Sequence, residues 1–236
     1  MRRVIIIFLL VIAALPLCAQ NIYLLSVGIS DYEGYDNDLR LPVNDAATIS
    51  KIYEKNSKGK VVTIFNSNAT CSAIKEKMSL LFSGAQKDDI IIFFFSGHGS
   101  TDGFCAYDGL LTYSEIRNIF SQSKCVNKMV FADACFSGEL RANNRHTTNS
   151  RVKNVMFFLS SRSDETSLES PSMNNGYFTA FLERGLRGGA DRNRNRIVTA
   201  KELFNFVSKG VKEMTGNKQH PVMWGNFSND MPVIRW

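Results

Sequence analysis

This chain of 236 residues lacks several features that would point to particular classes of protein. Its five cysteines match no zinc-ligand spacing, and they are too sparse for the disulfide scaffold of a small secreted domain. Its lysines and arginines are scattered among acids, with no basic helix and no aromatic platform, so nucleic-acid binding receives no support. No internal repeat and no low-complexity tract is present. The length and composition therefore favour a single globular domain.

The longest apolar run with charged flanks lies at the N-terminus and has the layout of an export signal. Two arginines precede an apolar stretch over residues 4–15, and the polar Gln20 follows shortly after it. The stretch is too short to span a bilayer comfortably. We therefore expect residues 1–19 to be a signal peptide that is removed on export to the periplasm or the cell exterior, with no membrane span afterwards. Lipid attachment at Cys18 is the alternative.

In residues 20–236, apolar runs of strand length alternate with helical patterns, which is typical of a parallel sheet covered by helices. The expected strands cover residues 22–29, 61–65, 90–95, 129–132 and 155–159, and Val233-Ile234 is expected to close the sheet. The first expected helix begins at Asn44-Asp45. Three further helices are expected over residues 74–81, 177–186 and 200–211. Asp108-Gly109, between two short apolar runs, predicts a hairpin with a type I′ turn.

Two of these strands end in residues that can do chemistry. The strand over residues 90–95 leads into a Ser-Gly-His-Gly segment with His98 and Gly99, and the strand over residues 129–132 leads to Cys135. The carboxyl ends of adjacent parallel strands form the ligand crevice of an α/β sheet, so His98 and Cys135 are expected side by side. An imidazole beside a thiol favours the thiolate or accepts its proton. The backbone amides of Gly99 and Cys135 are candidate donors to a developing oxyanion.

Taken alone, each of these two residues has a structural alternative. A histidine near a strand end is more often structural than catalytic, and a cysteine there is more often a small core residue. Their joint occurrence, each after an apolar strand and among small residues, is what favours a catalytic pair.

The segments FFFSGHGS and VFADACFSG resemble the two catalytic blocks of the caspase-like cysteine peptidases, nearest to bacterial metacaspases and orthocaspases (peptidase family C14, clan CD). The segments LPVNDA, SSRSDE and GYFT resemble further parts of the family, so the resemblance spans nearly all of residues 20–236. It implies a three-layer α/β/α sandwich with a mostly parallel sheet of about six strands. A large-subunit-like part would extend to about residue 140 and a small-subunit-like part would cover residues 154–236. It also implies a cysteine-type endopeptidase, a hydrolase that works through an acyl-enzyme and requires no cofactor.

The resemblance implies a substrate pocket as well. Metacaspases cleave after Arg or Lys, and the acidic residues that line their pocket correspond to Asp45 and Asp133. A carboxylate two residues before the nucleophile lies on the same face of the strand as Cys135 and can meet a substrate cation. Asp45 has the alternative interpretation of a helix N-cap. Arg162 falls where caspases place an arginine that binds an acidic substrate residue, so the basic preference is a hypothesis with a named rival.

The segment 141–153 is a basic, acid-free loop between the two parts of the domain. Its candidate self-cleavage sites are Arg141, Arg145, Arg151 and Lys153. Tethering gives such side chains a high effective concentration at an acidic pocket, so we expect the enzyme to process this loop itself. The rival to a peptidase is a catalytically weak caspase-like module that binds basic peptides. A serine hydrolase is disfavoured because no G-x-S-x-G elbow is present.

One further segment has oxygen donors at the spacing of an EF-hand loop. The weak candidate ligands are Asp191, Asn193, Asn195 and Glu202. Arg196 stands where the loop wants a glycine, and cations outnumber acids in the segment. We therefore interpret it as a look-alike that caps a helix, and calcium dependence elsewhere in the chain is not indicated by the sequence.

The other cysteines and histidines carry less information. With Cys135 a free thiol, at most one disulfide can form among Cys71, Cys105 and Cys125, and the spacing does not identify it. His146 and His220 are interpreted as surface residues. The natural substrate and the oligomeric state are not indicated.

Overall fold

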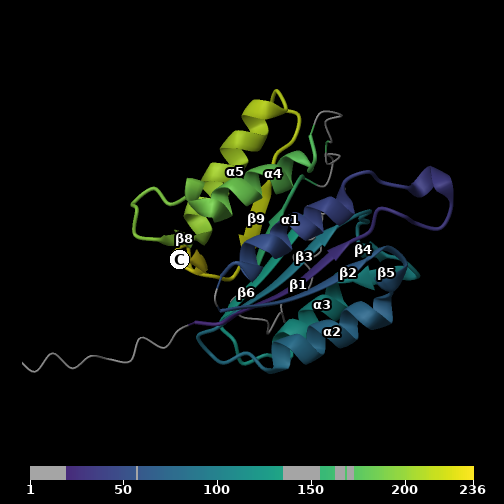
Figure 1. Ribbon diagram of the computed structural model, residues 1–236, viewed down its shortest axis with the longest axis horizontal. Helices are drawn as coiled ribbons and strands as arrows, with labels where there is room; N and C mark the ends of the chain where they lie inside the picture. Colours follow the sequence, from purple (N-terminus) through teal and green to yellow (C-terminus); the bar gives the residue numbers. More distant parts are fainter. Residues whose placement is uncertain (1–19, 57, 135–154, 163–167, 169–172) are drawn as a thin grey trace, which may run out of the picture.

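The computed structural model describes residues 20–56, 58–134, 155–162, 168 and 173–236 (Figure 1). The predicted signal peptide, Cys135, the self-cleavage candidates and His146 lie outside the described residues. The centre of the molecule is a six-stranded sheet with the strand order β2-β1-β3-β6-β7-β9. Its strands are β1 (Ile22–Gly28), β2 (Gly59–Phe65), β3 (Ile90–Ser96), β6 (Asn127–Asp133), β7 (Val155–Leu159) and β9 (Val222–Gly225). All neighbouring strands are parallel except β7 and β9, which confirms the predicted α/β class and mostly parallel sheet.

Helices cover both faces of this sheet (Figure 1). One face carries α1 (Pro42–Glu54), α4 (Tyr177–Arg184) and α5 (Ala200–Met214). The other face carries α2 (Cys71–Ser83) and α3 (Tyr113–Gln122). The result is the expected three-layer sandwich. None of the described helices has the length and apolar character needed to cross a membrane.

Strand β3 lies inside the sheet, between β1 and β6, as its apolar sequence indicates. All seven of its residues are buried, because alternate side chains enter the two separate cores of the sandwich. Ile91, Phe93 and Phe95 pack with α2 and α3, whereas the residues between them pack with α1, α4 and α5. An unbroken apolar run is the pattern that such a strand requires.

The closing strand of the sheet was predicted wrongly. Val233-Ile234 belongs to β10 (Pro232–Arg235), which pairs antiparallel with β8 (Ile197–Thr199) in a separate two-stranded sheet. Its two apolar side chains are buried in the core beneath α5, which accounts for their apolar character. The sixth strand of the main sheet is β9, where Trp224 stacks on Phe157 of β7 with ring centroids 4.3 Å apart.

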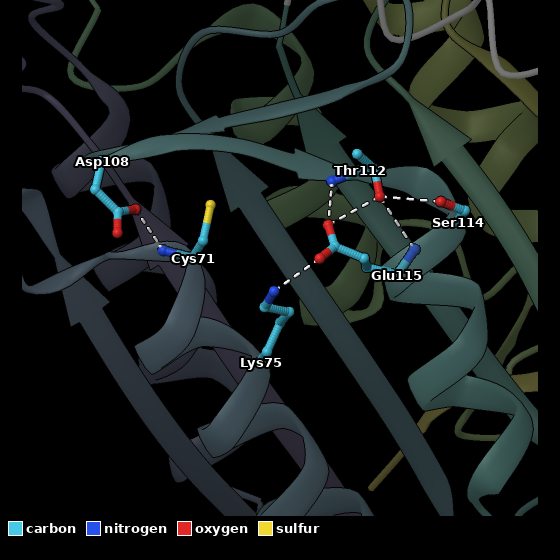
Figure 2. A network of polar contacts seen from close by, with 6 residues as sticks. All are labelled: Cys71, Lys75, Asp108, Thr112, Ser114 and Glu115. Atoms are coloured by element: carbon cyan, nitrogen blue, oxygen red, sulfur yellow. Dashed lines mark hydrogen bonds and ion pairs between the residues drawn. The ribbon is translucent and has the colours of Figure 1, made fainter.

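The predicted hairpin is present but its turn is of another kind. Strands β4 (Gly103–Ala106) and β5 (Gly109–Thr112) pair so that Tyr107 and Asp108 form the two-residue loop. Neither of these residues has a positive φ, so the turn is not type I′. The carboxylate of Asp108 instead accepts a hydrogen bond of 2.6 Å from the backbone N–H of Cys71, at the start of α2 (Figure 2).

A polar network fastens this hairpin to α2 and α3 (Figure 2). Nζ of Lys75 lies 2.7 Å from Oε1 of Glu115, while Oε2 of Glu115 accepts from the backbone N–H and the hydroxyl of Thr112. Thr112 and Glu115 form a capping box at the start of α3. The ammonium of Lys75 and the donors of Thr112 lower the pKa of Glu115 to about 2. The network therefore joins the hairpin to the two helices that cover this face of the sheet.

The three cysteines that the structure describes are free thiols, so no disulfide joins them. Cys125 is buried and its Sγ donates to the backbone oxygen of Asp89 at 2.9 Å. Burial raises its pKa to about 11, and burial is also the main cause that raises the pKa of Cys71 and Cys105. A raised pKa disfavours the thiolate, which is the nucleophilic form of cysteine.

Candidate active site

The carboxyl ends of β3 and β6 bring the two chemical segments of the sequence to one edge of the sheet. The strands are parallel neighbours, and Ser96 pairs with Asp133 at their ends. His98 lies two residues beyond Ser96 and is half-buried. Cys135 lies two residues beyond Asp133 in the sequence and is outside the described residues. The structure thus places His98 at the predicted edge and describes the strand that leads to Cys135.

The side chain of His98 is oriented by a backbone carbonyl. Its Nε2 lies 2.7 Å from the carbonyl oxygen of Asn37, in the short 3-10 helix η1 (Tyr35–Asn37). A carbonyl oxygen can only accept a hydrogen bond, so Nε2 must carry the hydrogen. In the neutral ring, Nδ1 is then the unprotonated nitrogen and is available to accept a proton.

The backbone of His98 is held as firmly as its ring. Its N–H donates to the hydroxyl of Tyr32 at 3.0 Å, and its carbonyl oxygen accepts from the N–H of Cys105 at 2.9 Å. Gly97 leaves room for this arrangement, because a Cβ there would stand 2.5 Å from the hydroxyl of Tyr32. The glycine before the histidine is thus explained by the close approach of a tyrosine.

Gly99 forms an isolated bridge with Phe104 of the hairpin. The two hydrogen bonds of this bridge flank Gly99, since they run from Cys105 to His98 and from Ser100 to Gly103. The bridge therefore makes no use of the amide of Gly99. Within the described part of the chain, no oxygen accepts a hydrogen bond from this amide.

Asp45 lies in the first turn of α1 and points into the protein. Asp45 is only 2% exposed. Oδ2 accepts from the hydroxyl of Ser96 at 2.9 Å, and Oδ1 accepts from Nδ2 of Asn175 at 2.9 Å and from the N–H of Gly176 at 3.1 Å. The N-cap position of α1 belongs to Leu41, so the alternative interpretation of Asp45 as a helix N-cap was wrong. Pro42 begins the helix two residues earlier than expected, at a position that suits its fixed φ.

Asp133 lies beside Asp45 and contacts the same helix start. Its Oδ2 accepts from the backbone N–H of Thr179 at 3.1 Å and from the hydroxyl of Thr179 at 2.8 Å. A Cβ on Gly176 would stand 2.5 Å from the same oxygen, so this glycine, the N-cap of α4, allows the carboxylate to come close. The two carboxylates therefore converge on the N-terminus of α4, where the helix dipole favours negative charge.

These surroundings disfavour the ionised form of Asp45. Burial, and next the negative charge of Asp133, hold the pKa of Asp45 well above its usual range. The hydrogen bonds from Asn175, Ser96 and Gly176 oppose this shift, and all three donors are neutral. None of these three hydrogen-bond donors to Asp45 is a Lys or Arg. The surroundings of Asp45 thus disfavour its negative charge, and a nearby cation would stabilise that charge.

The chain that leaves β6 is fixed up to its last described residue. The hydroxyl of Ser160, just beyond β7, accepts from the N–H of Ala134 at 3.2 Å and donates to its carbonyl oxygen at 3.1 Å. Ser160 is fully buried, and its own carbonyl oxygen accepts from the side chain of Gln219 at 2.9 Å. Ser160 therefore holds the last described residue before Cys135 in place.

A family model for the caspase domain, the domain of peptidase family C14, matches residues 23–231. The chain belongs to the caspase-domain family. Protein GSU0716 from Geobacter sulfurreducens superposes with a TM-score of 0.68 at 16% identity, over 89% of this chain and 95% of that one. Caspase-1 from Spodoptera frugiperda superposes with a TM-score of 0.65 at 17% identity, over 89% of this chain and 88% of that one. Both likenesses concern the fold. No curated protein matches this chain.

Two further residues of this caspase domain, Arg162 and His220, follow the end of β7 and precede β9, respectively. Arg162 follows the end of β7, is exposed, and is not among the hydrogen-bond partners of Asp45. The half-exposed His220 has its Nε2 3.2 Å from Oδ1 of Asn217.

The EF-hand look-alike is built from turns and a cap. Glu202 forms a capping box with Thr199 at the start of α5, which agrees with the predicted role in helix capping. The carboxylate of Asp191 accepts from the N–H groups of Asn195 and Arg196, at 3.2 and 2.9 Å. Arg196 adopts a φ of 64°, the left-handed conformation that a glycine would reach more easily. No group of three His, Cys, Asp or Glu side chains in the described ranges could hold a metal ion.

Several residues at the site were not predicted from the sequence. They are Tyr32, Asn37, Ser96, Asn175 and Thr179. Thr179 lies in the GYFT segment that resembles the family, and this resemblance could have identified it. Asn37 acts through its backbone oxygen, which any residue type could supply, so no signal in the sequence marks it.

Proposed function

We propose that this caspase domain is a secreted cysteine endopeptidase with Cys135 as nucleophile and His98 as its general base. The observation that carries the proposal is the hydrogen bond from Nε2 of His98 to the carbonyl oxygen of Asn37. It leaves Nδ1 as the proton acceptor at the edge of the sheet. Because Ser96 and Asp133 are paired neighbours, His98 and Cys135 each follow a paired residue by two positions. This register supports a Cys-His dyad.

The reaction follows from these groups. The sulfur of Cys135 attacks the carbonyl carbon of the scissile peptide while Nδ1 of His98 takes the thiol proton. The amides of Gly99 and Cys135 donate to the oxyanion of the tetrahedral intermediate, and the uncommitted amide of Gly99 supports this role. The carbon–nitrogen bond breaks and the proton passes from His98 to the leaving amine. Water, deprotonated by His98, then hydrolyses the acyl-enzyme and restores the thiol.

The proposed substrates carry Arg or Lys at the position before the cleaved bond. Asp45 has neutral hydrogen-bond donors only, and the charge of Asp133 beside it adds repulsion that a substrate cation would relieve. A guanidinium or ammonium group is the partner that such a carboxylate pair favours. Arg162 supports the rival preference for an acidic residue, although its exposed position after β7 gives it no part in the contacts of Asp45.

Covalent labelling tests this proposal. Mature protein should react with an acyloxymethyl ketone that bears Arg or Lys, and the Cys135→Ala variant should not. Labelling that survives the substitution would exclude Cys135 as the nucleophile. Preferential labelling by a probe with Asp would transfer specificity to Arg162. Tight binding of a basic peptide without any labelling would favour the peptide-binding module.

Self-processing of the loop 141–153 is part of the same proposal. The loop follows the nucleophile in the sequence and offers four basic side chains to an acidic pocket at high effective concentration. Wild-type protein should separate on a denaturing gel into two fragments, with a new N-terminus between residues 142 and 154. Cys135→Ala should stay whole. A wild-type chain that remains single and fully active after long incubation would contradict self-processing while leaving the dyad intact.

Export rests on the pattern of residues 1–19 alone. The expected result of N-terminal sequencing of protein recovered from the periplasm or the medium is a chain that begins near Gln20. An intact Met1 in the cytoplasmic fraction would contradict export.

A further inference from the structure

The segment between β1 and α1 is a closed loop that contacts His98 at two places. The N–H of Leu39 donates to the carbonyl oxygen of Ser30 at 2.8 Å, and the N–H of Tyr32 donates to Oδ1 of Asp38 at 3.1 Å. These two bonds join the start and the end of the loop. The loop therefore presents Tyr32 and the carbonyl of Asn37 as one unit.

We propose that Tyr32 is a positioning residue of this site, whose hydroxyl fixes the backbone of His98 while Asn37 fixes the ring. The proposal rests on the proposed function, because it assigns Tyr32 a role in keeping Nδ1 of His98 directed at the nucleophile. Tyr32 acts through His98 and is not itself expected to touch the reacting atoms.

One hydroxyl makes both of the contacts that this role needs. Oη of Tyr32 accepts from the N–H of His98 at 3.0 Å and donates to the carbonyl oxygen of Cys105 at 3.0 Å. It thus ties the end of β3 to the hairpin that follows. The pKa of Tyr32 is raised, mainly by burial, so the hydroxyl keeps its proton and remains a donor at neutral and moderately alkaline pH.

The ring of Tyr32 adds a second constraint. It lies 4.8 Å from the imidazole of His98, centroid to centroid, at an angle of 50°. The space for the hydroxyl exists because Gly97 has no Cβ. The tyrosine therefore limits the imidazole from one side, while the carbonyl of Asn37 holds Nε2.

Removal of the hydroxyl alone separates these constraints. In Tyr32→Phe the ring stays, but the N–H of His98 and the carbonyl of Cys105 lose their shared partner. An unpaired backbone group moves toward water or another partner. Displacement of a catalytic group by about 1 Å can cost a hundredfold in rate. We expect kcat to fall by about ten- to a hundredfold, with KM for Arg substrates changed by less than about threefold, since Tyr32 makes no contact with Asp45.

The kinetic experiment compares Tyr32→Phe with Tyr35→Phe on an Arg-containing peptide. Tyr35 lies in the same loop but is 91% exposed, so it loses the same hydroxyl without touching His98. Tyr35→Phe should retain the wild-type kcat. A kcat for Tyr32→Phe within twofold of wild type would overturn the proposal.

A second measurement keeps this test separate from the fate of the proposed function. Nitrogen NMR of the histidine rings, recorded in Cys135→Ala and assigned with a His98→Gln variant, reports the tautomer of His98 without any turnover. One nitrogen should carry the hydrogen when Tyr32 is present. The two nitrogen shifts should converge in Tyr32→Phe, because displacement of the His98 backbone moves Nε2 away from the carbonyl of Asn37 that fixes the tautomer. Unchanged shifts would overturn the proposal even if kcat falls, because the loss would then be structural. Converging shifts in a protein without peptidase activity would support the role of Tyr32 and reject the proposed function.

Discussion

Glu115 and Asp45 both lie in the first turn of a helix and both accept several hydrogen bonds, yet they experience opposite electrostatic surroundings. Glu115 faces the ammonium of Lys75 across the gap between α2 and α3 (Figure 2), and its pKa is lowered to about 2. Asp45 is buried beside the carboxylate of Asp133, and its pKa is raised. The first cluster contains its own cation, whereas Asp45 has only neutral donors.

This difference distinguishes Glu115, which has a cationic partner, from Asp45, whose three hydrogen-bond donors are neutral. An ion pair near the surface fastens elements together and can be exchanged for other contacts at little cost. A buried carboxylate beside a like charge disfavours its own ionisation, so a cationic ligand would stabilise its charged form. We propose that Asp45 and Asp133 serve a ligand, whereas the Lys75–Glu115 network serves the fold.

The largest expected effect is the loss of peptide hydrolysis when His98 or Cys135 is replaced. His98→Ala and Cys135→Ala should each reduce peptide hydrolysis by at least about a hundredfold, because a general base alone contributes that much. Circular dichroism should show an intact fold, since His98 lies beyond the end of β3 and outside its core. Glu115→Gln is the matched control and should retain full activity. Retention of more than about a tenth of the activity in either dyad variant would contradict the pair.

The next effect concerns selectivity. Asp133→Asn, which keeps an acceptor for Thr179, should lower kcat/KM for Arg and Lys substrates by about ten- to over a hundredfold, the value of a charge-assisted contact. Asp45→Asn should act in the same direction. Substrates with a neutral residue at this position should change far less. A peptide library in which wild-type protein prefers Asp would instead assign specificity to Arg162.

Some features of the site could be predicted from local sequence patterns, whereas the role of Asp45 could not. The unbroken apolar run of β3 and the two small-residue turns after β3 and β6 are local patterns, and they located the sheet centre and the position of His98. The role of Asp45 is decided by Ser96, Asn175 and Gly176, which lie 51, 130 and 131 residues away in the chain. Its local sequence equally suits an N-cap, so only tertiary packing distinguishes the two interpretations.

Other features escaped prediction for the same physical reason. The edge strand β9 is defined by its pairing with β7, while the more apolar Val233-Ile234 is buried by packing under α5 without joining the main sheet. The turn of the β4–β5 hairpin is accompanied by the contact of Asp108 with the start of α2, which the dipeptide Asp-Gly does not reveal. Patterns within one element are visible in a sequence, whereas contacts between distant elements are not.

A smaller effect should appear in stability: replacement of Asp45 should stabilise the folded protein although it lowers activity. Asp45→Asn should raise the free energy of unfolding at pH 7.5, because it removes a buried carboxylate that Asp133 repels and keeps an acceptor for Asn175. A gain of about 1 kcal/mol would raise Tm by roughly 2–4 °C in a domain of this size. The pKa of Asp45 is higher in the folded than in the unfolded chain, so wild-type stability is lost as pH rises through the folded value. The advantage of Asn should therefore shrink toward pH 4, and a lower Tm for Asp45→Asn at pH 7.5 would contradict the comparison.

The smallest effect belongs to the structural cluster and can be isolated with a second capping box in the same chain. Glu202 caps α5 through Thr199 with the geometry that Glu115 has with Thr112, but Glu202 has no lysine partner among the described residues. Glu115→Gln should lower Tm more than Glu202→Gln does, and the difference between the two losses should be at most about 2 °C. It is small because both side chains of the Lys75–Glu115 pair are more than one-third exposed, so that solvent screens the pair. The lowered pKa of Glu115 means that its contribution is present above the unfolded pKa near 4.5 and is lost as pH falls toward about 2. Thermal unfolding between pH 7 and pH 3 should therefore show the two variants converging in acid. A Glu115→Gln variant that loses activity on Arg substrates would contradict the distinction between the clusters, since it would give the ion pair a share in the function that we propose for Asp45 and Asp133.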